Sequence, residues 1–120
     1  MILELRTYRL RPGTTGVFVR LMSGESAALL ANHGIRVVAS GASLVPEAEG
    51  IEEAYLIRAF ASLEARDLQE TAFYASSEWV DGPRAAVLDC IESYHTIVLE
   101  TSEEAVAALE RAMGGTLPPF

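Results

Sequence analysis

Apolar and polar residues alternate at the start of the chain, and this period of two predicts a strand. It covers residues 2–10 and ends at 11–13, where Arg-Pro-Gly is a turn signal. The next segment changes to a three- and four-residue spacing, which predicts a helix that begins at Thr14 or Thr15 and ends near residue 32. Its apolar face is expected to contain Val17, Phe18, Leu21, Met22, Ala28 and Leu29. His33 is expected to cap the helix, and Gly34 to end it in a left-handed conformation.

The middle of the chain predicts a hairpin followed by a helix. Residues 35–42 and 53–60 are rich in β-branched and aromatic side chains and are separated by a loop, so we expect them to pair. Ser62 is placed to cap a helix over residues 63–75. The buried side of this helix is expected to hold Leu68, Ala72 and Ala75.

A shorter helix and a last strand follow. Pro83 is unsuited to a helix interior but suits a first turn, so a short helix is expected over residues 84–88. Residues 94–99 predict the last strand. The large aromatic residues of this part of the chain are expected to serve packing, with Trp79 as an anchor and Tyr55, Phe73 and Tyr74 in the core or an interface.

The C-terminal segment predicts one more helix. Thr101 and Glu104 have the spacing of a capping box at the start of a helix over residues 102–113, and Gly114-Gly115 would end it. Residues 114–120 are expected to form a loose tail or to dock on a neighbour.

The order strand, helix, strand, strand, helix, strand predicts an α+β fold of the ferredoxin-like, split βαβ type. This fold has a four-stranded antiparallel sheet with helices on one face. Because the other face would be bare and partly apolar, we expect a second copy, a ligand or both to cover it. The predicted assembly is therefore a homodimer, a dimeric α+β barrel, with one cavity per protomer between sheet and helices.

The first strand carries charged side chains at every second position. Glu4, Arg6 and Tyr8 lie on one side, and Leu3 and Leu5 on the other. In the predicted topology this strand is central, between the third and fourth strands. We expect the two leucines to face the helices and the polar trio to face the open side.

The third strand places Leu56, Arg58 and Phe60 beside this trio. A charge in such a poorly hydrated place must be paired, so Glu4 is expected to bond Arg6 or Arg58. Two interpretations follow. In one, the trio fixes the register of the dimer. In the other, it lines a small-molecule cavity in which Arg6 or Arg58 holds a carboxylate, phenolate or enolate and Glu4 or His95 moves a proton. His95 lies on the last strand, and the alternative for it is a structural histidine.

Composition excludes several function classes. The net charge of −8 and the absence of lysine argue against nucleic-acid binding, because such affinity comes from clustered basic residues. No apolar run is long enough to span a bilayer, and no signal peptide is recognisable. The single cysteine, Cys90, is expected to be a buried small hydrophobe, which fits a reducing compartment. The sequence thus predicts a soluble, cytoplasmic protein without membrane or nucleic-acid partners.

No cofactor or metal is predicted. His33, His95 and Cys90 do not have the spacing of metal ligands, and no acidic cluster joins them. No glycine-rich phosphate loop follows a strand, and no Gly-x-Ser-x-Gly elbow is present.

Two segments resemble NIPSNAP-domain proteins. The opening ILELRTY, followed by Arg-Pro-Gly at 11–13, resembles the first strand and turn of that family. Phe-Ala-Ser-Leu at 60–63, then Arg66 and the pair Glu78-Trp79, resembles its strand end, its helix and the Glu-Trp pair that closes the helix. The resemblance covers residues 1–100, so residues 101–113 would be an extra helix. It implies a dimeric α+β barrel, in a superfamily that also contains small monooxygenases, haem-degrading enzymes and polyketide-tailoring enzymes.

One departure from the family concerns the strand before the Ser-Leu helix. Relatives often carry His and Trp where this chain has Leu56 and Arg58. These positions share a face with Phe60, so the lining of the expected cavity differs from that of the relatives. Sequence and resemblance together predict a cofactor-free enzyme or binding protein, monooxygenase- or cyclase-like, for a small, apolar, oxygenated compound such as an aromatic or polyketide-like molecule. The alternative is a non-catalytic dimeric scaffold or interaction module.

Overall fold

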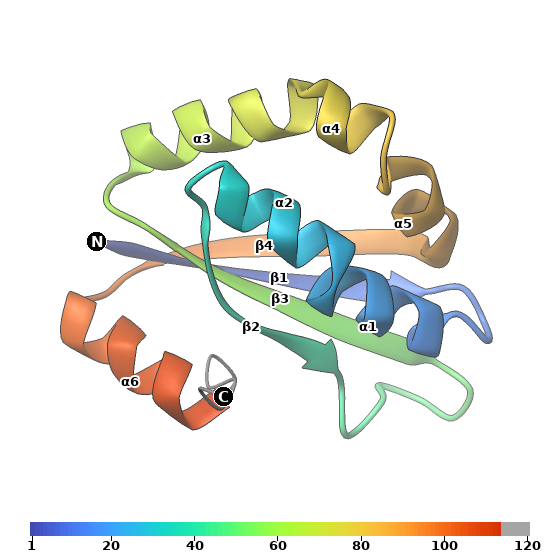
Figure 1. Ribbon diagram of the computed structural model, residues 1–120. Helices are drawn as coiled ribbons and strands as arrows, with labels where there is room; N and C mark the ends of the chain where they lie inside the picture. The colour runs from blue at the N-terminus through green and yellow to red at the C-terminus, as the bar shows by residue number, and fades with distance from the viewer. Residues whose placement is uncertain (114–120) are drawn as a thin grey trace, which may run out of the picture.

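A computed structural model describes residues 1–113 of the chain. Four antiparallel strands form one sheet in the order β2-β3-β1-β4 (Figure 1). The strands are β1 (Ile2–Leu10), β2 (Arg36–Ala42), β3 (Glu52–Phe60) and β4 (Ile91–Glu100). The helices are α1 (Thr15–Ser23), α2 (Glu25–Asn32), α3 (Leu63–Ala75), α4 (Ser77–Val80), α5 (Arg84–Cys90) and α6 (Glu103–Met113).

This topology confirms the predicted ferredoxin-like α+β fold. The central strand β1 lies between β3 and β4, as expected from the sequence. Within residues 1–113, no helix combines the length and the apolar character needed to cross a bilayer. The predicted end of α6 at Gly114-Gly115 and the tail at 114–120 lie outside the described residues.

Local signals account for several helix ends. Gly34 has a φ of 73° after the C-cap His33, and the Ser62 hydroxyl accepts a hydrogen bond from Ala65 N, both as predicted. The single helix predicted for residues 14–32 is divided at Gly24, whose φ of −108° and ψ of −101° are not helical. The cap of α6 is also corrected: Ser102, not Thr101, accepts the hydrogen bond from Ala105 N.

Helices α1 to α5 cover one face of the sheet, and the side chains beneath them correct a prediction. In Figure 1, α3 and α4 pass above the strands, and α1 and α2 lie in front of them. Tyr8 packs under α1, with its ring 4.8 Å from that of Phe18. Glu4 is fully buried and bonds Arg66 of α3. The polar trio of β1 therefore faces the helices, and Leu3 and Leu5 face the opposite side, the reverse of the expected orientation.

Helix α6 lies on that opposite side, so the helices are not confined to one face. Val106 has no exposed surface and packs on Leu3 and Ile57. The guanidinium of Arg36 on β2 bonds Glu110 Oε1 at 2.6 Å and Glu103 Oε2 at 2.6 Å, which ties the helix to the sheet. The helix covers the β2 side of this face. Ile97 and Leu99 of β4 remain about half exposed.

Candidate functional site

The site is built around a buried ion pair between two neighbouring strands. Glu4 on β1 is the register partner of Arg58 on β3, and neither side chain has exposed surface. Arg58 Nε donates to Glu4 Oε1 at 2.8 Å, and Arg66 Nε of α3 donates to Glu4 Oε2 at 2.7 Å. Arg58 is one of the two partners predicted for Glu4. The pairing compensates the cost of removing both charges from water.

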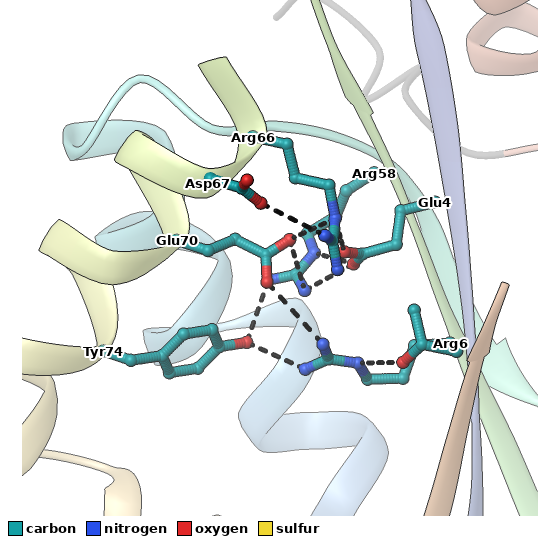
Figure 2. Close-up of polar contacts among 8 residues, drawn as sticks. Glu4, Arg6, Arg58, Arg66, Asp67, Glu70 and Tyr74 are labelled. Atoms are coloured by element: carbon teal, nitrogen blue, oxygen red, sulfur yellow. Dashed lines mark hydrogen bonds and ion pairs between the residues drawn. The ribbon is translucent and has the colours of Figure 1, made fainter. Parts of the chain in front are cut away.

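A second carboxyl group lies beside this pair (Figure 2). Glu70 of α3 places Oε2 at 3.1 Å from Arg66 Nε and 3.5 Å from Arg58 Nη2, while Oε1 lies 3.7 Å from Arg6 Nη2. Oε2 is buried, but neither arginine is aligned with it as a hydrogen-bond donor. Glu70 thus lies between the buried pair and Arg6.

The surroundings shift the pKa values of Glu4 and Glu70 in opposite directions. Burial favours the protonated form of Glu4, but hydrogen bonds from Glu70, Arg58 and Arg66 and the charge of Arg58 outweigh it and lower the pKa of Glu4 to about 2. Burial and the hydrogen bond to Glu4 raise the pKa of Glu70 to about 7. The proton that the pair binds most readily is therefore carried by Glu70.

Arg6 is held in place by uncharged partners. Its Nε donates to Thr96 Oγ1 at 2.9 Å and its Nη1 to the Tyr74 hydroxyl oxygen at 3.1 Å. The guanidinium carbon lies 4.9 Å from the centre of the Tyr94 ring. The same Tyr74 oxygen accepts a hydrogen bond from Arg58 Nη1 at 2.9 Å, so Tyr74 joins the two arginines.

A cavity of about 460 Å³ lies next to Arg6, between the sheet and helices α1 to α5. Its polar lining is Arg6, Tyr8, Ser26, Glu70, Tyr74, Arg84 and Tyr94. Its apolar lining is Met22, Leu30, Leu56, Phe73, Trp79, Val87, Leu88 and Ile91. Burial raises the pKa of Tyr8 to about 12, so this hydroxyl stays protonated at neutral pH.

The cavity brings together only some of the residues singled out from the sequence. Arg6, Tyr8 and Leu56 line it. Glu4, Arg58 and Phe60 are on the same face of the sheet but are buried behind its wall.

The expectation that His95 and Glu4 serve one cavity is wrong. His95 pairs with Thr7 across β1 and β4, and residues of that parity point to the face opposite the cavity. Its side chain is exposed there. Its strand neighbours Ile97 and Leu99 are exposed as well.

Sequence reasoning missed the inner side of α3. Leu68, expected to be buried, is 66% exposed, and Ala72 and Ala75 are exposed too. The side that faces the sheet carries Arg66, Glu70 and Tyr74, with Phe73 in the core beside them. The four-residue spacing of these polar residues was a detectable signal, since it places them on one helix face.

The cavity also contains a buried serine that the sequence analysis did not single out. Ser26 of α2 is 1% exposed, and its hydroxyl has no hydrogen-bond partner among the described residues. It continues the four-residue spacing of Phe18 and Met22, whose side chains are buried on the same side. Trp79 is buried against Phe73, as expected of a packing anchor, and forms part of the cavity wall.

Within residues 1–113, no group of three or more His, Cys, Asp or Glu side chains is arranged to hold a metal ion. Cys90 is buried, as predicted, and lies among apolar core residues.

Solved structures similar to this one share its fold. A NIPSNAP family protein of unknown function from Agrobacterium tumefaciens is 24% identical, with a TM-score of 0.70 over 85% of this chain and 88% of that chain. An uncharacterised NIPSNAP domain protein from Burkholderia xenovorans is 17% identical, with a TM-score of 0.69 over 86% and 96% of the two chains. A candidate antibiotic biosynthesis monooxygenase from Caulobacter crescentus is 14% identical, with a TM-score of 0.54 over 85% and 90% of the two chains.

A search of the curated proteins found no match. The NIPSNAP family model, in contrast, matches residues 3–112, which include both sides of the cavity and most of α6. On this match, the chain belongs to the NIPSNAP family.

Proposed function

We propose that this protein binds a small, largely apolar molecule with an acidic or carbonyl oxygen, in the cavity between the sheet and helices α1 to α5. Aromatic and polyketide-like compounds are the class that we favour. The observation that carries the proposal is the position of Arg6 at a cavity of about 460 Å³ whose walls combine apolar side chains with polar groups. A volume of roughly 300–1,000 Å³ is usual for small-molecule sites, and such sites combine apolar walls with a few polar groups.

Arg6 is better suited to hold the ligand than Arg58. The guanidinium of Arg58 has no exposed surface and is engaged by Glu4, whereas Arg6 lines the cavity. The side chain of Arg6 is also 13% exposed, and its nearest carboxylate oxygen, Glu70 Oε1, lies 3.7 Å from Nη2. This separation is too long for a hydrogen bond, so Nη2 can donate to an oxygen of a ligand. Thr96 and Tyr74 keep the guanidinium in position for that contact.

The apolar walls support a ring or short hydrocarbon body for the ligand. Phe73 and Trp79 provide aromatic surface at one side, and Leu30, Leu56 and Val87 provide aliphatic surface. Ser26 adds a buried hydroxyl with which a second oxygen of the ligand could bond. The likeness to candidate antibiotic biosynthesis monooxygenases from Caulobacter crescentus and Bacillus cereus concerns the fold alone, at 14% and 18% identity. The ligand class therefore rests on the cavity, not on these relatives.

Binding of an aryl carboxylate tests this proposal. We expect calorimetry to detect binding of 3-phenylpropionate to the wild-type protein, and Arg6→Ala to weaken it by about tenfold or more, since a charge-assisted hydrogen bond is lost. Arg20→Ala is the matched control, because Arg20 is an exposed arginine that does not line the cavity. Equal affinities of the Arg6 and Arg20 variants, or no binding by the wild type, would contradict the proposal. The second of these results would favour a non-catalytic scaffold.

We also propose that the protein is a homodimer that pairs through the part of the sheet that α6 leaves uncovered. Ile97 and Leu99 are 46% and 45% exposed there, next to Thr7 and His95. Adjacent apolar side chains on a sheet face favour contact with another protein surface. A dimer formed in this way would leave the cavity of each protomer complete, because the residues that line the cavity are on the other side of the sheet.

A further inference from the structure

We propose that Glu70 is the group that moves a proton in the cavity: its carboxylate accepts a proton from a carbon next to a carbonyl group of the ligand, while Arg6 holds the carbonyl oxygen. This inference rests on the proposed function and adds a reaction to it. It replaces the roles that the sequence suggested for Glu4 and His95, since Glu4 is sealed inside the ion pair and His95 is on the far face.

The position of Glu70 carries the proposal. It is the one carboxyl group among the described residues that line the cavity. Its Oε1 lies 3.7 Å from Arg6 Nη2, so an acceptor of protons and a donor of hydrogen bonds lie side by side at the cavity wall. A ligand carbonyl that bonds Arg6 would therefore bring its neighbouring carbon close to Glu70. Effective proton transfer needs this type of proximity before it needs any particular acidity.

The other oxygen of Glu70 lies near two arginines on the side away from Arg6. Arg66 Nε lies 3.1 Å from Oε2, and Arg58 Nη2 lies 3.5 Å from it. Figure 2 shows the Glu70 carboxyl group between these arginines on one side and Arg6 on the other. Since α3 supplies both Arg66 and Glu70, the helix holds the carboxyl group at a constant depth above the sheet. Such support makes a side chain a precise base.

The neighbouring charges allow Glu70 to exist both with and without its proton near neutral pH. Burial and the hydrogen bond to Glu4 raise the pKa of Glu70, while Arg58 and Arg66 act in the opposite direction. Tyr8 lines the same cavity, but burial raises its pKa to about 12, which makes it a poor base at neutral pH. The titratable and charged groups that face Glu70 are Glu4 and Arg6 of β1, Arg58 of β3, and Arg66 and Tyr74 of α3.

The reaction needs no redox partner. The C–H bond next to the carbonyl breaks, and its proton forms an O–H bond on Glu70. The electron pair moves into the carbon framework and onto the carbonyl oxygen, which becomes an enolate oxygen bonded by the Arg6 guanidinium. Transfer of the proton back to carbon restores the ligand, and its transfer to the enolate oxygen gives the enol. The step therefore exchanges or relocates a proton and leaves all oxidation states unchanged.

Phenylpyruvate is a suitable probe, because it has an aromatic ring, a carboxylate and acidic protons beside a carbonyl group. In D₂O, we expect the wild-type protein to accelerate the loss of its CH₂ proton signal in NMR spectra. Glu70→Gln is expected to slow this enzymatic exchange by about 100-fold, since an amide retains the size of the side chain but cannot accept the proton. Glu64→Gln is the control, because Glu64 is an exposed residue of the same helix. We expect it to exchange at the wild-type rate.

Binding and exchange separate this inference from the proposed function. If Glu70→Gln binds 3-phenylpropionate as the wild type does but loses exchange, the inference is supported. If the wild type binds 3-phenylpropionate without accelerating exchange, or if Glu70→Gln exchanges at the wild-type rate, the inference is overturned and the proposed function stands. Should Glu70→Gln fail to fold, Glu70→Asp serves instead, with slower exchange expected because its carboxyl group is one methylene shorter. A pH profile adds a further measure: exchange by the wild type should rise as Glu70 ionises, and this limb should be absent from the Gln variant.

Discussion

The two faces of the sheet are covered in the reverse of the way that their side chains suggest. The face with Glu4 and Arg58 is closed by five helices of the same chain, and the side chains of this ion pair have no exposed surface. The face with Leu3 and Ile57 has a single helix, α6, and its β4 side is open. Charge is thus buried within one protomer, and apolar surface remains available for a neighbour.

This difference separates the stability of the protomer from its assembly. The charged face depends on α3, which supplies Arg66 and Glu70 to the buried pair. A partner subunit is not needed to bury Glu4, Arg6 and Tyr8. The interpretation in which this trio fixes dimer register is therefore wrong, since the trio points into its own protomer.

The largest effect is expected from Arg58→Ala on the charged face. The substitution leaves Glu4 without its nearest cation in a place without water, so we expect a loss of about 3–5 kcal/mol in the free energy of unfolding, measured with urea. The double variant Glu4→Leu with Arg58→Met should lose less than Arg58→Ala alone, because no carboxylate is then left without its strand partner. A double variant that is less stable than Arg58→Ala would contradict this account.

A smaller effect is expected from Val106→Ala on the other face. Val106 is fully buried under α6, and the substitution removes about two methylene equivalents of apolar contact. At about 0.8 kcal/mol for each, the loss is about 1.5 kcal/mol in the same urea measurement. A cost as large as that of Arg58→Ala would show that the two faces contribute alike.

The pH dependence of stability between pH 4.5 and 7 should reflect the charged face, where Glu70 is the carboxyl group with a raised pKa. The pKa of Glu4 is lowered from 4.5 to about 2. Its contribution to the free energy of unfolding is therefore fully present above pH 4.5 and is lost as the pH falls toward 2. The pKa of Glu70 is raised to about 7, so its contribution is complete below 4.5 and is lost as pH rises toward 7. Thermal unfolding should therefore show maximal stability near pH 4.5, with a decline toward pH 7 that Glu70→Gln removes. An unchanged decline in that variant would assign it to other groups.

The smallest effect on protomer stability, but the clearest on assembly, is expected from Leu99→Glu. A carboxylate in the centre of the proposed dimer contact should convert the dimer to a monomer in light scattering, with little change in unfolding of the protomer. Leu68→Glu is the control, because Leu68 is an exposed leucine on the outer side of α3. A wild-type protein that is already monomeric would remove the basis for the proposed dimer.

Much of the fold could be predicted because its signals are local. Alternation along β1 and the turn at 11–13 define the first strand, and the order of elements then places it in the centre of the sheet. The same topology and the need to compensate a buried charge predicted Arg6 or Arg58 as the partner of Glu4, and the structure pairs Glu4 with Arg58.

The candidate site could be predicted less well, because alternation defines two faces without saying which one the helices cover. Both faces of β1 contain apolar residues: Leu3 and Leu5 on one, Ile2 and Leu10 on the other. The decision lies in α3, whose inner side carries polar residues that satisfy the charges of the sheet. The apolar pattern of that helix points to its outer side, around Leu68, and therefore does not predict that Glu70 faces the sheet.

The hydroxyl oxygen of Tyr74 gives the site a built-in link between its occupancy and its interior. It accepts one hydrogen bond from Arg6 at the cavity and one from Arg58 in the sealed ion pair (Figure 2). A ligand that draws Arg6 toward itself takes one donor away from this oxygen and leaves it to Arg58 alone. Binding of a ligand to Arg6 would thereby change the hydrogen bonding of Arg58 in the buried ion pair, through the hydroxyl oxygen of Tyr74.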